Sequence, residues 1–154
     1  MIGQSLETTA VGSLQGGEMA DQTRDCVVRG SGSYESQQGP TYAPGISAET
    51  VGAKALFLGV VTMLPGTRTK SHIHEVHESA FYMISGDEVE VWTGDRLEHK
   101  ETARRGDYLF IPPRVPHVVV NRSETVPAVF VGARNEPTAQ ESVAMLPDLD
   151  QLVP

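Results

Sequence analysis

Short runs of β-branched and aromatic residues alternate with polar and turn-forming residues through the middle of the chain, between residues 53 and 134. Gly, Pro, Asp and Asn separate these runs at roughly ten-residue spacing, which is typical of a domain built from short strands. In the run 88–91, glutamate alternates with valine, which is the period of a strand with one buried face. The pattern predicts strands over 54–63, 69–74, 79–85, 87–93, 96–103, 107–111, 116–121 and 126–133.

The abundance of turn formers supports the same interpretation. The chain contains 15 glycines and 10 prolines, and no segment has a convincing helical pattern. Such a composition favours many short strands over long helices. We therefore predict an all-β protein, a sandwich or barrel whose mouth can hold one small ligand.

The two flanks differ in texture from this central region. Residues 1–50 are rich in Gly, Ser, Gln, Thr and Glu, interrupted by a Cys-Val-Val patch at 26–28, so we expect a flexible N-terminal arm. Met19 opens a run that resembles a translation start, and residues 1–18 are expected to be a non-native leader. The predicted barrel spans residues 51–136. The polar C-terminal tail spans 137–154, and its apolar run 143–146 is expected to pack as a short helix or turn.

Length and charge limit the classes of function. A chain of 154 residues is about one domain. With 12 basic and 20 acidic residues the formal net charge is −8, which disfavours nucleic acid and anionic membranes as partners. No stretch reaches the roughly 18–20 apolar residues of a spanning helix, and the single cysteine, Cys26, fits a reducing compartment. We expect a cytoplasmic protein with a small-molecule substrate.

Histidines supply the candidate chemistry. His72 and His74 are two residues apart on a predicted strand, so their side chains project from the same face. His117 begins another predicted strand and could bring a third imidazole to the same point. Neutral imidazole binds zinc, iron, copper, nickel and cobalt, and three or four nitrogen ligands leave a position open for water or substrate.

The spacing around these histidines resembles the two sequence motifs of the cupin superfamily. The first motif is matched by Gly66, His72, His74, a following acidic position and Gly86, and the second by Gly106, Pro112, His117 and Asn121. The resemblance implies a single cupin (jelly-roll) β-barrel that holds one divalent transition metal ion, which could be Fe, Zn, Mn, Ni, Co or Cu. It also implies a homodimer formed by exchange of arm strands, for which residues 26–28 are the best candidate.

The chain departs from the family pattern at two positions. Arg114 stands where the second motif usually has glycine, and Ser79 stands where the family commonly has a glutamate ligand. Two ligand sets follow: His72, His74, His77 and His117, which we prefer, or the same set with Glu78 in place of His77. His77 shares the strand parity of Ser79, whereas Glu78 would need a bulge at 75–78 to turn inward.

The same alternation predicts the pocket and its chemistry. Ser79, Phe81 and Met83 are expected to face inward and to form an apolar substrate pocket beside the metal. The resemblance implies an enzyme acting on a small oxygenated molecule, aromatic or polyketide-like, by dioxygenase or by Lewis-acid chemistry of the cyclase or isomerase type. In either case His77 or Glu78 is the predicted catalytic group that moves the proton. The alternative is a non-catalytic, metal-containing cupin that binds or senses a small molecule.

Overall fold

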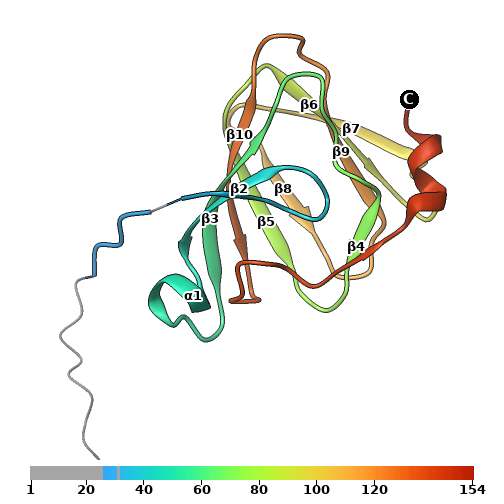
Figure 1. Cartoon of the computed structure of the whole chain (residues 1–154). Coiled ribbons are helices and arrows are strands. Elements are labelled where there is room, and N and C mark those ends of the chain that lie inside the picture. Colours follow the sequence, from blue (N-terminus) through green and yellow to red (C-terminus); the bar gives the residue numbers. More distant parts are fainter. Residues whose placement is uncertain (1–25, 31) are drawn as a thin grey trace, which may run out of the picture.

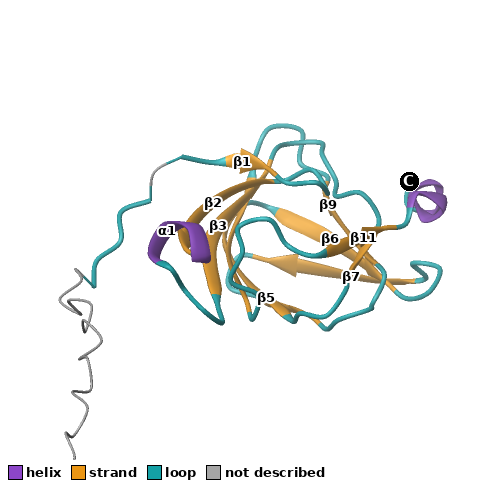
Figure 2. Cartoon of the chain, turned by 60° about the horizontal axis from the view of Figure 1, so that its bottom comes forward, coloured by secondary structure: helices purple, strands orange, loops and turns teal. Residues whose placement is uncertain are grey.

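Two antiparallel sheets face each other in the computed structural model, which describes residues 26–30 and 32–154 (Figures 1 and 2). The six-stranded sheet contains, from edge to edge, β1 (Tyr34–Glu35), β2 (Thr41–Ile46), β3 (Phe57–Met63), β10 (Ala128–Arg134), β5 (Ser79–Ser85) and β8 (Tyr108–Ile111). The five-stranded sheet contains β11 (Val143–Met145), β4 (His72–His74), β9 (His117–Asn121), β6 (Glu88–Thr93) and β7 (His99–Arg104). Two short helices, α1 (Ala48–Val51) and the 3₁₀ helix η1 (Pro147–Leu152), lie outside the sheets.

This architecture confirms the all-β jelly-roll prediction. Every strand predicted in the central region is present, with bounds shifted by a few residues. Residues 34–46, which the prediction assigned to the arm, contribute β1 and β2 to the six-stranded sheet. The predicted leader at residues 1–18 lies outside the described residues. Within the described part of the chain, no helix is long and apolar enough to cross a membrane.

Alternation of buried and exposed residues places the core between the sheets. Along β3 the odd-numbered residues from Phe57 to Met63 are buried, while Leu58 and Val60 face outward. β10 alternates in the same way and buries Phe130. Each large apolar side chain buried in this layer contributes roughly 1.5–3 kcal/mol to the stability of the fold.

Three turn residues show why the motif spacing is fixed. Gly86, between β5 and β6, has φ 123°, and Gly106, before β8, has φ 97°. A Cβ atom on Gly86 would lie 2.8 Å from Met83 Cε, so a larger residue would also collide with the core. Arg114 has φ 66°, a left-handed conformation that costs a non-glycine residue roughly 1–2 kcal/mol. The usual glycine of the second motif therefore corresponds to a real backbone requirement, which Arg114 meets under strain.

The C-terminal segment, residues 136–154, lies along the edge of the five-stranded sheet (Figure 1, red). The prediction of a helix or turn at 143–146 is wrong, because β11 pairs with β4 and places Val143 opposite His74 and Met145 opposite His72. The local sequence carries no alternation that signals a strand. The hydrogen-bonding groups at the free edge of β4 select the extended conformation.

Side-chain contacts attach this segment beyond β11. The amide and the hydroxyl of Ser71 both donate to Asp150 Oδ1 at 2.8 Å. The Arg68 guanidinium donates to the carbonyls of Asp150 and Val153. Val153 is buried and packs in a cluster with Val118 of β9. The segment that sequence analysis treated as a polar tail therefore packs directly against the strands that carry the histidines.

Candidate metal centre

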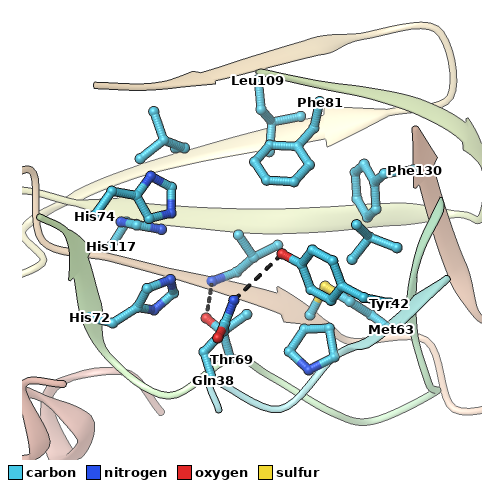
Figure 3. A pocket seen from close by; sticks show the side chains of 14 residues that line it. Gln38, Tyr42, Met63, Thr69, His72, His74, Phe81, Leu109, His117 and Phe130 are labelled. Atoms are coloured by element: carbon cyan, nitrogen blue, oxygen red, sulfur yellow. Dashed lines mark hydrogen bonds between the residues drawn. The ribbon is translucent and has the colours of Figure 1, made fainter. Parts of the chain in front are cut away.

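Three histidines converge between the sheets. His72 and His74 project from β4, and His117 begins β9, where it is paired with His72 in the strand register. The ring centroids lie 4.1 Å apart for His72 and His117 and 4.7 Å apart for His74 and His117. One nitrogen from each ring lies within 4.8 Å of the others, and all three residues are buried. Figure 3 shows the three imidazoles together at one side of a cavity.

Backbone carbonyls orient two of these rings. His72 Nδ1 lies 2.7 Å from the Lys70 carbonyl, and His117 Nδ1 lies 2.9 Å from the Val115 carbonyl. A carbonyl oxygen only accepts, so Nδ1 must carry the proton in both residues. The lone pair of each ring is then on Nε2, available to a metal ion. A hydrogen bond on the other ring nitrogen is the usual way in which proteins fix a metal-binding tautomer.

The surroundings keep the three imidazoles neutral. Burial lowers the pKa of His72 and lowers the pKa of His117 well below its ordinary value. Burial also lowers the pKa of His74 to about 4, despite the opposing charge of Glu141. Neutral imidazole is the form that binds metals, so at pH 7 the rings need not lose a proton before they bind a metal ion.

A second group of ligands adjoins the first through His74. The side chains of His74, His77 and Glu141 each offer one atom within 4.8 Å of the others, and all three residues are buried. Glu141 Oε2 accepts from His77 Nε2 at 3.2 Å and lies 3.8 Å from His74 Nε2. On the far side of the His77 ring, Nδ1 lies 3.3 Å from Glu136 Oε2.

Glu141 is a buried carboxylate with partners on both oxygens. Its Oε1 accepts from the Gln38 amide and, at 3.2 Å, from the Tyr42 hydroxyl. Burial alone would raise the pKa of Glu141, but the hydrogen bond from His77 and the charge of Arg134 outweigh burial and lower it to about 2. Sequence analysis missed Glu141 and Gln38. Each lies far along the chain from the histidine motifs, in a polar stretch where nothing marks one residue as buried.

The structure separates the two residues proposed for the fourth ligand position. His77 is buried and, with Glu141, belongs to the second group, which shares only His74 with the group of His72 and His117. Glu78 is exposed and belongs to neither group, and its backbone amide donates to Asn135 Oδ1. The expected alternation holds here, with His77 and Ser79 inward and Glu78 outward. The bulge that would turn Glu78 inward is not present in the described chain.

The cavity beside the three histidines has apolar walls. Figure 3 shows the rings of Tyr42, Phe81 and Phe130 across from the imidazoles. The remaining wall residues are Gln38, Pro40, Val61, Met63, Thr69, Leu109, Ile111 and Val119. The free volume is about 40 Å³, room for about three water molecules.

Of the three predicted pocket residues, Phe81 alone lines this cavity. Met83 is fully buried but packs in the apolar core, where its Cε atom lies under the hairpin at Gly86. Ser79 is also buried but does not line this cavity, and its hydroxyl has no hydrogen-bond partner in the described part of the chain. Alternation along β5 predicted the inward direction of all three side chains, but not how far along the barrel the open space extends.

These residues suit a divalent transition metal ion. Three neutral, buried imidazoles with converging nitrogens form the donor set that zinc, iron, nickel, copper and cobalt accept. His74 Nδ1 is buried and has no hydrogen-bond partner among the residues described, which is unusual for a buried ring nitrogen. Nε2 of the same ring lies 3.8 Å from Glu141 Oε2, too far for a hydrogen bond, so this nitrogen is open to an ion.

Comparison with known proteins identifies the family. Residues 59–133 match the cupin domain. A Klebsiella pneumoniae protein with a double-stranded β-helix domain is similar, with a TM-score of 0.56 and 20% identity over 73% of this chain and 88% of that one. The chain therefore contains a cupin domain at residues 59–133.

Oxalate decarboxylases are also structurally similar. The enzyme of Lactobacillus farciminis, solved as a formate complex, has a TM-score of 0.61 and 19% identity, covering 75% of this chain and 33% of that one. The enzyme of Bacillus subtilis has a TM-score of 0.59 and 22% identity, covering 75% of this chain and 30% of that one. This chain thus spans about a third of their length, and the likeness concerns the fold. The chain has no match among the curated proteins.

Proposed function

We propose that this small cupin is a metal-dependent enzyme that acts on a small oxygenated organic molecule. One divalent transition metal ion would be held by His72, His74 and His117. The observation that carries the proposal is the convergence of three buried imidazoles at the wall of an apolar cavity. Such an ion, when bound, supplies a Lewis acid or a redox centre for an oxygen atom of the substrate.

The residues of the chain divide the remaining tasks. The carbonyls of Lys70 and Val115 fix the rings of His72 and His117, so that these ligands need no rearrangement. The aromatic walls exclude water and orient the substrate. His77 can hold a proton at Nε2, where Glu141 Oε2 stabilises it at 3.2 Å. Neither of the two predicted proton-transfer groups lines the cavity, but His77 is buried whereas Glu78 is exposed.

The volume of the cavity bears on the substrate. Typical ligand sites enclose about 300–1,000 Å³, whereas this space is about 40 Å³. It favours a molecule of few non-hydrogen atoms. An aromatic or polyketide-like substrate would require Phe81, Phe130 or Tyr42 to move. Because a structurally similar oxalate decarboxylase was solved with formate, small carboxylates should be tested first, for both dioxygenase and Lewis-acid chemistry.

The small volume also favours a second candidate, a non-catalytic cupin that binds or senses a small molecule through its metal. Oxygen uptake and product formation should be measured with the metal-loaded protein and a panel of small carboxylates, ketones and phenols. Turnover of any member supports the enzyme. Saturable binding without turnover across the panel supports the binding module.

Both candidate functions require a metal ion bound by the three histidines, and metal content tests this requirement. Protein purified without added metal should contain close to one equivalent of a transition metal by elemental analysis. His117→Ala should lose it, and His99→Ala, which removes an exposed histidine, should retain it. Equal metal content in the two variants would refute the three-histidine site.

We further propose a cytoplasmic homodimer. Val27, in the patch at 26–28, is 68% exposed and belongs to no strand of the described chain, so it is free to extend a partner's sheet. Light scattering should give the mass of a dimer. Val27→Asp should weaken the dimer if this patch forms the contact. A monomeric wild-type protein would contradict the proposal that residues 26–28 pair with a partner's sheet.

A further inference from the structure

Glu141 occupies a position that its hydrogen bonds do not fully explain. Its side chain is 3% exposed, and a carboxylate buried to this extent is costly unless its charge is matched. Neutral donors, the Gln38 amide and the Tyr42 hydroxyl, occupy Oε1, and the positive charge of Arg134 acts on the carboxylate without a hydrogen bond to it. The other oxygen, Oε2, faces two imidazoles instead, His77 at 3.2 Å and His74 at 3.8 Å.

The distances around Oε2 suit a shared ion. Two ligands about 2.1 Å from the same metal ion can be at most about 4.2 Å apart, and the 3.8 Å between Glu141 Oε2 and His74 Nε2 lies within that limit. The same distance is too long for a hydrogen bond. His74 is also a member of the three-histidine group, so Glu141 stands beside an imidazole already assigned to the metal.

The carboxylate is held in this position by several contacts. The next residue, Ser142, accepts a hydrogen bond from the Glu75 amide at 3.1 Å, directly after β4, and its own amide donates to Glu136. Gln38 and Tyr42 fix the carboxylate from the opposite side, so the side chain has little freedom. Such support of a ligand by hydrogen bonds to its other atoms is typical of protein metal sites.

We propose that Glu141 is the carboxylate ligand of the metal centre and binds through Oε2 beside His74. The inference rests on the proposed function, because it requires that the histidine cluster bind an ion. It replaces both His77 and Glu78 as fourth ligand, and His77 becomes a positioning residue that donates to the carboxylate. One negative charge then offsets one unit of the ion's charge, which makes the centre a weaker Lewis acid than a site with neutral ligands alone.

Cobalt(II) titration of the apoprotein tests this assignment, with affinity followed by calorimetry and by visible absorption. Glu141→Gln should weaken Co²⁺ binding by at least about 10-fold, the least that loss of even a supporting contact costs, and should change the visible spectrum. Glu78→Gln removes the same charge from an exposed position outside both groups, so it should change neither the Co²⁺ affinity nor the visible spectrum. An effect of Glu78→Gln with none of Glu141→Gln would overturn the assignment in favour of Glu78.

His117→Ala separates failure of the inference from failure of the proposed function. If His117→Ala weakens Co²⁺ binding and Glu141→Gln leaves both affinity and spectrum unchanged, the metal site stands and Glu141 is not a ligand. If His117→Ala leaves Co²⁺ binding unchanged, the metal site itself is wrong. Circular dichroism of each apoprotein should match the wild type, which excludes unfolding as the cause.

A cysteine substitution distinguishes direct coordination from an effect of charge at a distance. A thiolate bound to Co²⁺ produces a ligand-to-metal charge-transfer band in the near ultraviolet. Glu141→Cys should show this band after addition of Co²⁺, whereas Glu78→Cys and the wild type, which keeps Cys26, should not. Absence of the band from a folded Glu141→Cys protein that binds Co²⁺ would contradict coordination at this position.

Discussion

The barrel strands and the C-terminal segment contribute to the same site in different ways. β4 and β9 carry three histidines, and nearby backbone carbonyls fix the rings of two of them, His72 and His117, so the strands determine their position. Glu141 comes from an irregular stretch and depends on side-chain contacts with Gln38, Tyr42 and His77. The comparison indicates that the barrel strands hold the histidines through the backbone. It also indicates that the C-terminal segment, which carries Glu141, can detach without unfolding of the barrel.

The largest expected effect concerns the barrel alone. Asn121, at the end of β9, donates through Nδ2 to the carbonyls of Met63, Leu64 and Val126. Asn121→Ala leaves these carbonyls without their donor in a buried setting and should lower the free energy of unfolding by about 3 kcal/mol. Chemical denaturation measures this loss. Asn135→Ala, at an exposed asparagine, should cost less than about 1 kcal/mol, and equal losses would contradict the role of Asn121.

The next effect tests whether the C-terminal segment detaches separately. Asp150→Ala removes the acceptor of two hydrogen bonds from Ser71 and should destabilise the segment by about 2 kcal/mol. Hydrogen exchange should accelerate at the Leu146 amide, which donates to the Ser71 carbonyl, with β6 and β9 unaffected. Asp148→Ala, an exposed position in the same helix, is the control. Uniform acceleration across both sheets would show that the segment and barrel unfold as one unit.

A smaller effect of opposite sign is expected at Arg114. Its left-handed backbone is strained, and its amide donates to the His74 carbonyl at 2.8 Å. Arg114→Gly relieves the strain but gives the unfolded chain more freedom, for a net gain of about 0.5–1 kcal/mol. Thermal unfolding should show a higher midpoint. Arg105→Gly, where φ is not left-handed, should lower it, and a lower midpoint for Arg114→Gly would contradict the strain.

The smallest effect lies on the outer face of the five-stranded sheet, away from the histidine cluster. Partial burial raises the pKa of Glu90, but hydrogen bonds from Lys100, Trp92 and Arg122 outweigh it and hold the pKa below its ordinary value. A lowered pKa means that these contacts stabilise the fold when the carboxylate is ionised. The stabilisation is present above the ordinary glutamate pKa and is lost as the pH falls through the lowered value.

Glu90→Gln should therefore lower stability at pH 7 by about 0.2–0.5 kcal/mol. The difference from the wild type should shrink as the pH falls below the ordinary glutamate pKa and vanish once the pH is below the lowered pKa of Glu90. Denaturation of both proteins across this pH range measures it. A difference that persists at low pH would show that the effect comes from packing and not from charge.

The sequence predicted the barrel strands and their histidines, but it did not predict the packing of the C-terminal segment. Strand alternation and turn glycines identified the barrel, because period-two burial and left-handed turns leave a local pattern at residues such as Val89 and Gly86. The cluster of three histidines was predictable for the same reason. Their spacing within β4 fixes their common face, and the motif places His117 on a neighbouring strand.

Glu141 and the strand β11 leave no such local pattern. Residues 143–145 become a strand because β4 has a free edge, and Glu141 becomes buried because Gln38 and Tyr42 approach it from the other end of the chain. Both are tertiary effects that involve residues about 70–100 positions apart, which single-sequence patterns cannot register. The extent of the cavity also depends on packing between distant residues. Alternation along β5 therefore predicted both Phe81 and Met83 as cavity residues, although only Phe81 lines the cavity.

Diffraction data collected at the absorption edge of the bound metal test the central claim most directly. The account predicts one anomalous peak about 2.1 Å from a ring nitrogen of each of His72, His74 and His117, with the Glu141 carboxylate in contact with the same ion. A peak at any other place in the molecule, or no peak in crystals of protein that contains one equivalent of metal, would contradict it.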